Sequence, residues 1–181
     1  IKVMTAVSGL LNNAISINET IYDHVIFDKI VPSPSCNSKK GHGDQDFSNA
    51  IMNSCNYFFY EVGYRLATDK NGKYSDSLGL SKLSETAKLF GFNSTSGIEL
   101  GEAEPSFAQT DAIRSAIGYG HFFTPLHISR YATTLATKGT LFKYTLIDKI
   151  TDKDGKVIRS LSPVVENNIT ELSNKAWNKI T

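Results

Sequence analysis

The chain has 181 residues, of which 40% are hydrophobic and 20% charged, and this composition excludes a disordered chain and predicts a globular domain with a substantial core. Its 19 basic and 18 acidic residues give a net charge of +1, so the charge does not indicate binding to nucleic acid or to an anionic membrane. The longest apolar runs are shorter than the roughly 18 residues that a membrane-spanning helix needs.

The first predicted element is a helix over residues 1 to 15, where Val3 and Val7 belong to one apolar face. The chain starts inside this helical pattern without an initiator methionine, so we expect it to be part of a longer protein. Lys2 lies in the first turn, on a face that is otherwise apolar. Either an exposed helix end or a specific function explains a lysine at this place.

An irregular segment follows over residues 24 to 46, in which Pro32 and Pro34 rule out a regular helix. A loop of this length is unusual in a compact domain, and such loops are typically functional or disordered. The sequence therefore marks this segment as a candidate for a functional role.

Two consecutive helices are predicted next. Asp46 is a suitable N-cap for a helix over residues 47 to 54, and the following helix carries Cys55 and several aromatic residues at core-facing spacing. The triplet Ser54-Cys55-Asn56 thus falls at a helix junction, where side chains can point into a cleft. Serine and asparagine also favour helix ends, so capping and catalysis both remain open from these residues alone.

Residues 81 to 90 are predicted to form a helix that ends at Gly91, and residues 92 to 125 are rich in loops. A second helix is predicted over residues 125 to 139 and ends at Gly139. A hairpin over residues 146 to 161, with its turn at Asp154-Gly155, and an amphipathic helix over residues 168 to 180 complete the predicted elements. His121 and His127 flank the start of the 125 to 139 helix. We expect these two histidines to line the surface and not to bind a metal.

Four stretches resemble, in the same order, the transpeptidase domain of penicillin-binding proteins. They read IKVMTAVSGLL, FSNAIMNSCNYFFYEVGYRL, LFGFNSTSGIEL followed by Glu102 or Glu104 and Pro105, and AIGYGHFFTPLHISRYATTLATKGT. The likeness covers residues 1 to about 150 and is closest to class B, the monofunctional enzymes that cross-link peptidoglycan. The GYG sequence at 118 to 120 departs from the Gly-Gln-Gly that is usual in this family.

The resemblance implies the α/β fold of serine beta-lactamases and penicillin-binding proteins, a five-stranded antiparallel sheet with helices on both sides. Residues 1–181 would form a partial transpeptidase domain, mostly its helical part. Lys2 would be the lysine of a Ser-x-x-Lys motif whose nucleophilic serine lies outside this chain, and the Lys-Thr-Gly motif would follow Thr181. Most of the sheet would also lie outside this piece.

The same resemblance assigns roles to three residues. A serine hydroxyl needs a nearby base, and Lys2, one helical turn away, would be that base or part of it. Ser54 would pass a proton toward the leaving group and help to hold Lys2. Asn56 would hydrogen-bond the amide of the substrate and also the lysine.

The implied reaction is acyl transfer in cell-wall synthesis. A stem peptide ending in D-Ala-D-Ala would lose its last residue to form an acyl-enzyme, which an amine of a neighbouring strand then attacks, and beta-lactams would be trapped at the acyl stage. The implied partners are peptidoglycan stem peptides, beta-lactams and a membrane glycosyltransferase. The implied location is the extracytoplasmic face of a bacterial membrane, where an N-terminal transmembrane helix outside this chain would anchor the protein. A beta-lactam sensor or a non-catalytic scaffold of the same fold is the alternative.

A metal site is a second candidate feature. Cys36, His42 and Cys55 are all metal-ligand types, and with one aspartate they would suit a closed, structural, tetrahedral zinc. Some cell-elongation members of the class B family carry zinc beside this motif. Their Asp-His-Cys spacing resembles Cys36, six residues to His42 and thirteen to Cys55, with cysteine in place of the middle aspartate.

The fourth ligand and the state of the cysteines stay open at the level of the sequence. Asp23 is our choice for the fourth ligand of one zinc per chain, and Asp28 or His24 could serve instead. The alternatives to a metal are a Cys36–Cys55 disulfide, which would stabilise the fold by roughly 2–4 kcal/mol, and two unrelated reduced cysteines.

Overall fold

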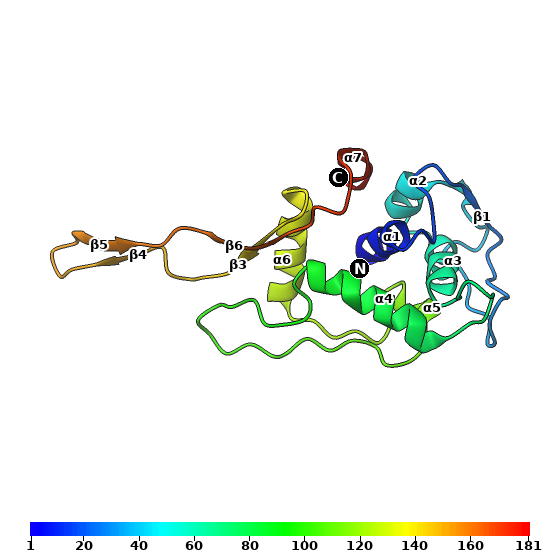
Figure 1. The fold of residues 1–181 in the computed structure, drawn as a ribbon, viewed down its shortest axis with the longest axis horizontal. Coiled ribbons are helices and arrows are strands. Elements are labelled where there is room, and N and C mark those ends of the chain that lie inside the picture. The colour runs from blue at the N-terminus through cyan, green and yellow to red at the C-terminus, as the bar shows by residue number, and fades with distance from the viewer.

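Helix α1 (Lys2–Leu11) lies among the other helices in the computed structural model, which describes residues 1–181 (Figure 1). Helices α3 (Asn56–Leu66) and α4 (Asp76–Leu89) pack directly against it. Val7 of the predicted apolar face is fully buried, and so is Met4, whereas Val3 of that face is half-buried. The first turn of α1 is therefore held in place by the core of the molecule.

The remaining helices are α2 (Phe47–Met52), α5 (Ala112–Ser115), α6 (Pro125–Ala136) and α7 (Asn174–Ile180). The strands are β1 (Ile21–Asp23), β2 (Gly43–Gln45), β3 (Thr140–Lys143), β4 (Lys149–Thr151), β5 (Val157–Ser160) and β6 (Val164–Asn168). They form three separate two-stranded antiparallel sheets, β1–β2, β3–β6 and β4–β5. The chain is thus α/β, with more residues in helices than in strands.

The pairing of β1 with β2 closes the long irregular segment at its base. Asp23 lies opposite Gly43 in this ladder, so the two ends of the intervening loop are adjacent. The sequence analysis missed both strands because each has only three residues and neither shows an alternating pattern. The short ladder brings residues from both ends of the segment toward Cys55.

The ribbon of β3 and β6 contacts α6 through β3 and leads away from it into the β4–β5 hairpin, which projects from the helical body as an arm (Figure 1). The predicted hairpin and its turn are confirmed, and Gly155 takes the left-handed conformation at φ 83°. All residues of β4 and β5 are exposed. No helix of the chain is long and apolar enough to cross a membrane.

Several predicted helix boundaries were wrong. The first helix ends at Leu11 and not at residue 15, because Asn13 adopts a left-handed conformation with φ 53°. Helix α4 starts at Asp76, five residues before the predicted start, and includes Gly79. The absence of a side chain at Gly79 allows close packing against Ala67, since a Cβ there would lie 2.8 Å from the Cβ of that alanine.

The predicted helix over 168 to 180 is also shorter than expected. It begins at Asn174, where the Ser173 side chain accepts the Ala176 N–H and caps α7. Asn168 instead ends strand β6, since the residues before it pair with β3. The only tryptophan, Trp177, is buried as α7 packs beside α2.

A matched pair of glycine substitutions tests the close packing of α3 against α5. A Cβ at Gly63 would lie 2.8 Å from the Cβ of Ala116 and 3.1 Å from the carbonyl oxygen of Ala112. We expect Gly63→Ala to lower the free energy of unfolding by about 1–3 kcal/mol, because overpacking outweighs the gain in helix propensity of about 1 kcal/mol. Gly101→Ala is the control, since nothing lies within 4 Å of its position. Chemical denaturation of the domain measures both, and equal stability of the two variants would contradict the packing argument.

Candidate active site and metal cluster

The amine of Lys2 reaches across from α1 to the junction of α2 and α3. Its Nζ donates to the Ser54 carbonyl oxygen at 2.6 Å, to Ser54 Oγ at 2.7 Å and to Asn56 Oδ1 at 2.6 Å. The structure therefore brings together the three residues that the sequence analysis singled out. A lysine on this face of α1 is explained by these three acceptors.

The turn between the two helices explains how Ser54 and Asn56 both face Lys2. Asp46 caps α2 by accepting the Asn49 N–H, as predicted, and α2 ends at Met52. Ser54 then takes the left-handed conformation with φ 51°, which is uncommon for a residue with a side chain. Such strained residues persist only where the surrounding structure fixes them.

Cys55 is the residue that starts the second helix of the motif. Its backbone is extended, its N–H donates to the Ala50 carbonyl oxygen, and its Sγ accepts the Phe58 N–H at 3.5 Å. Cys55 is fully buried, whereas Ser54 on one side is exposed and Asn56 on the other is half-buried. The cysteine thus fixes the backbone between the two polar residues.

Burial of Lys2 favours its neutral form. Burial lowers the pKa of the Lys2 ammonium from its ordinary value of 10.5, while the nearby Cys36 and Cys55 act in the opposite direction. The net shift is downward, so a larger fraction of the amine is uncharged near neutral pH than in a solvated lysine. An uncharged amine can accept a proton.

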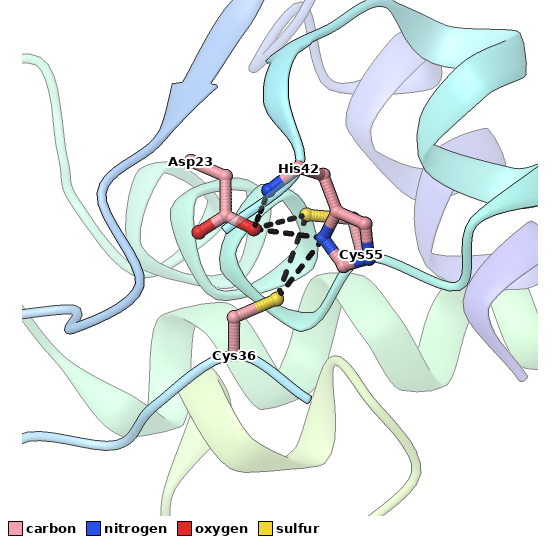
Figure 2. Close-up of side chains that lie close together, drawn as sticks. All are labelled: Asp23, Cys36, His42 and Cys55. Carbon is pink, nitrogen blue, oxygen red and sulfur yellow. Dashed lines mark hydrogen bonds and ion pairs between the residues drawn. The ribbon is translucent and has the colours of Figure 1, made fainter. Parts of the chain in front are cut away.

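A cluster of four side chains lies directly behind this turn (Figure 2). Asp23 ends β1, Cys36 and His42 belong to the loop between β1 and β2, and Cys55 is the N-cap of α3. One ligand atom of each residue lies within 4.8 Å of all the others. These are the four residues chosen from the sequence.

The distances within the cluster are those of groups that converge on one point. Cys36 Sγ lies 3.9 Å from Cys55 Sγ and 3.4 Å from His42 Nδ1, and Asp23 Oδ2 lies 3.4 Å from Cys55 Sγ and 2.8 Å from His42 Nδ1. Tetrahedral zinc, with bonds of about 2.0–2.3 Å, separates its ligand atoms by roughly 3.3–3.8 Å. The Cys36–His42 and Cys55–Asp23 separations fall in this range, whereas Asp23 and His42 are at hydrogen-bond distance and would move apart around an ion. Two thiols, an imidazole and a carboxylate therefore fit zinc in chemistry and lie close to the required separations.

The carboxylate of Asp23 is buried and ionised. Burial raises the pKa of this group, but hydrogen bonds from Cys36, the Val25 N–H, His42 and Cys55 outweigh it, and the net pKa is lowered. The His42 backbone N–H also donates to Asp23 Oδ2 at 3.0 Å. The aspartate thus organises the cluster from the loop side.

The other residues weighed for the cluster lie elsewhere. The ring of His24 packs against the rings of Tyr22 and Tyr57, at centroid distances of 4.8 and 5.9 Å, and Asp28 does not belong to the group of converging ligand atoms. Cys36 and Cys55 are free thiols in this structure. Their sulfur atoms are separated by 3.9 Å, compared with about 2.05 Å in a disulfide.

A second buried polar cluster was not anticipated. The Glu102 carboxylate accepts the Ser96 N–H and hydroxyl at 2.7 Å each and the Thr124 hydroxyl at 2.7 Å, and it lies 3.3 Å from His127 Nδ1. The side chains of Glu102 and His127 are 3% and 0% exposed. This cluster joins the loop after α4 to the N-terminus of α6, where Thr124 and His127 form a capping box.

We predicted that His121 and His127 line the surface. This was wrong for His127, which is buried, and only partly right for His121, which is half-buried. His127 is buried because its ring caps the start of α6, and its Nε2 contacts the Ser94 carbonyl oxygen at 3.0 Å. The half-buried His121 lies between the Ala108 N–H and the Ser115 carbonyl oxygen. The Thr-Pro pair before His127 was the available sequence signal, since it marks a helix start at which residue N3 faces inward.

Comparison with known proteins identifies the family. Residues 1–181 match the family described as penicillin binding protein transpeptidase domain, and the chain belongs to this family. It is 29% identical over 159 residues to peptidoglycan D,D-transpeptidase MrdA of Haemophilus influenzae, covering 77% of this chain and 22% of that protein. It is 28% identical over 142 residues to stage V sporulation protein D of Bacillus subtilis, covering 74% of this chain and 20% of that protein. The chain thus spans about a fifth of the length of these curated relatives.

Solved structures show the same fold. Penicillin-binding protein 2B of Streptococcus pneumoniae superposes with a TM-score of 0.82 at 20% identity, over 99% of this chain and 32% of that one. Penicillin-binding protein 2 of Helicobacter pylori, solved in complex with MreC, gives a TM-score of 0.72 at 22% identity, over 99% and 32%. The expected fold of the penicillin-binding proteins is therefore confirmed for this chain.

The Glu102 cluster predicts a difference between two neighbouring glutamates. We expect Glu102→Gln to lower the free energy of unfolding by about 1–3 kcal/mol, because an amide cannot accept from all the donors that face the carboxylate. Glu104→Gln is the control, because Glu104 is exposed. Chemical denaturation at neutral pH measures both, and an equal effect of the two changes would contradict the assignment.

The stabilisation by the Glu102 carboxylate has a defined pH dependence, which a comparison of wild type with Glu102→Gln measures. Burial raises the pKa of Glu102, but the hydrogen bonds from Ser96 and Thr124 outweigh it and the pKa is lowered from 4.5. The stabilisation by this carboxylate is therefore complete above its unfolded pKa and disappears as the pH falls through the lower folded value. The stability difference between wild type and Glu102→Gln should accordingly narrow only below about pH 4.5.

Proposed function

We propose that the protein containing this chain is a peptidoglycan D,D-transpeptidase, which cross-links stem peptides through a serine acyl-enzyme and is acylated by beta-lactams. The observation that carries the proposal is the set of three short hydrogen bonds from Lys2 to Ser54 and Asn56. A half-buried amine with a lowered pKa is placed to accept the proton of a hydroxyl that attacks a carbonyl carbon. The nucleophilic serine itself would precede Lys2, outside this chain.

The roles of the three residues follow from their contacts. In its neutral form Lys2 has two N–H donors and one lone pair, so it takes the proton of the nucleophile with the lone pair while two of the three surrounding acceptors orient the amine. Ser54, hydrogen-bonded to Lys2 through its hydroxyl, is placed to relay a proton to the leaving amine. Asn56 has its carbonyl oxygen occupied by Lys2, so its amide NH₂ is available to donate to the substrate.

We also propose that Asp23, Cys36, His42 and Cys55 hold one structural zinc ion. Four protein ligands fill a tetrahedral site, so a bound ion would stabilise the fold without taking part in the reaction. The argument rests on the converging distances and on the place of Cys55 between Ser54 and Asn56. The ligand residues of this chain would fix the backbone that aims both polar side chains at Lys2.

The cellular setting that we propose follows from the same reaction. Stem peptides and beta-lactams are the substrates, and a membrane glycosyltransferase of the cell-wall machinery is the partner that supplies uncross-linked strands. Among the structural relatives, penicillin-binding protein 2 of Helicobacter pylori was solved with MreC. The protein would act at the extracytoplasmic face of a bacterial membrane, held there by an anchor N-terminal to this chain.

Acylation by a fluorescent penicillin tests the proposed activity in the full-length protein. We expect wild type to be labelled, and Lys2→Ala to reduce the second-order acylation rate constant about 10²–10⁴-fold, as for removal of a positioned general base. Lys70→Ala is the control, because Lys70 is exposed. If the fluorescent penicillin labels neither wild type nor the control, the transpeptidase proposal is refuted. Turnover of a stem-peptide substrate separates a transpeptidase from a sensor, which would stay acylated, and from a scaffold, which would not react.

The metal content and the Cys55→Ser variant test the zinc proposal. Elemental analysis of the purified protein should find one zinc for this domain, and Cys55→Ser should lose it. The variant should unfold at a lower temperature and be acylated more slowly, because the turn that carries Ser54 and Asn56 loses its fixed point. The proposal would be contradicted if Cys55→Ser had the same metal content, thermal stability and acylation rate as the wild type.

A further inference from the structure

Two free thiols lie in contact immediately behind the proposed catalytic turn. Cys36 Sγ and Cys55 Sγ are 3.9 Å apart, and both residues are buried, with exposed fractions of 7% and 0% (Figure 2). A disulfide would bring these atoms about 2 Å closer together. The pair is therefore within a modest movement of a covalent bond.

The two cysteines belong to segments that are fixed to different degrees. Cys55 is the N-cap of α3, whose residues Phe58, Phe59 and Val62 are buried in the core. Cys36 lies on the loop between β1 and β2, which is tied back through the Cys36 N–H to the Val25 carbonyl oxygen and through the three-residue ladder. Cys36 is the more exposed of the two residues, so an oxidant would meet it first.

A covalent bond at Cys55 would alter the turn that aims Lys2. Cys55 Sγ accepts the Phe58 N–H and contacts Asp23, and both interactions would change if the sulfur turned toward Cys36. The adjacent Ser54 is held in an uncommon left-handed conformation, and its carbonyl and hydroxyl oxygens both bind Lys2. A turn under this constraint cannot absorb a shift of Cys55 without moving Ser54 or Asn56.

We propose that Cys36 and Cys55 form a reversible disulfide when no metal is bound, and that this bond switches off the Lys2, Ser54 and Asn56 set. The oxidant is a disulfide, either a small molecule or a protein. Cys36 attacks it to give a mixed disulfide and one released thiol, and Cys55 then displaces the second thiol. Two S–H bonds are lost, one S–S bond forms, and the oxidant is reduced to two thiols.

This switch rests on the proposed function, and it gives the metal a second effect. Coordination to zinc would engage a lone pair of each sulfur and slow its exchange with a disulfide, so a metal-loaded site would be protected. Loss of the metal leaves the two sulfurs facing each other. The activity would then depend on both the metal supply and the thiol–disulfide balance around the protein.

The test uses the full-length protein in three states: metal-loaded, stripped with a chelator, and stripped then treated with oxidised glutathione. Peptide mapping by mass spectrometry should find Cys36 joined to Cys55 in the third state only, with the loss of two hydrogens and no retained glutathione. Acylation by a fluorescent penicillin should slow about 10²-fold between the second and third states, as for a small misplacement of catalytic groups. Dithiothreitol should reverse both changes, and prior saturation with zinc should prevent them.

Cys36→Ser is the matched control. This variant cannot form the bond, so oxidised glutathione should leave its acylation rate unchanged from that of its own untreated sample. If the variant does not fold, wild type saturated with zinc serves as the control, because its acylation rate before and after oxidised glutathione can be compared without a substitution.

The outcomes separate the switch from the proposed function. Persistent thiols, a mixed disulfide that does not resolve, or an internal disulfide with unchanged acylation would each overturn the switch while leaving the transpeptidase intact. A reduced, metal-loaded protein that no penicillin acylates would overturn the proposed function, and with it the inhibitory role of the bond.

Discussion

The hydrogen bonds from the Lys2 amine to Ser54 and Asn56 tie the first turn of α1 to the junction of α2 and α3. An amine that is partly removed from water needs acceptors, and these come from a turn in which Ser54 takes the left-handed conformation. The buried faces of α1 and α3 keep the turn and the amine at bonding distance. Packing of apolar side chains thus sets the geometry of a polar site.

Two polar clusters fix the loops on either side of this arrangement. Asp23, Cys36, His42 and Cys55 hold the long loop between β1 and β2 against the start of α3. Glu102 and its partners hold the segment after α4 against the start of α6. Buried polar groups are costly unless each is paired, and no buried side-chain nitrogen or oxygen in this chain lacks a hydrogen-bond partner. Each cluster can therefore specify one position for a loop that apolar packing alone would leave variable.

The proposed metal and the proposed disulfide are two chemical states of the same cysteine pair. In both, Cys55 transmits the state of the β1–β2 loop to its two neighbours, because a buried N-cap residue cannot move independently of the turn it begins. The catalytic residues would then respond to conditions outside the active site without any large change in the fold.

The sequence by itself determined the helical face of α1, the Asp46 cap, the arm hairpin and, through its resemblance to one family, the residues of the candidate sites. These features depend on local spacing or on motifs, which a linear chain displays directly. Only the tertiary structure decided that Asp23 and not Asp28 or His24 joins the two cysteines, that His127 is buried on Glu102, and that the β1–β2 ladder closes the loop. Each of these depends on contacts between residues far apart in the chain, and such contacts follow from how the helices pack and not from local sequence pattern.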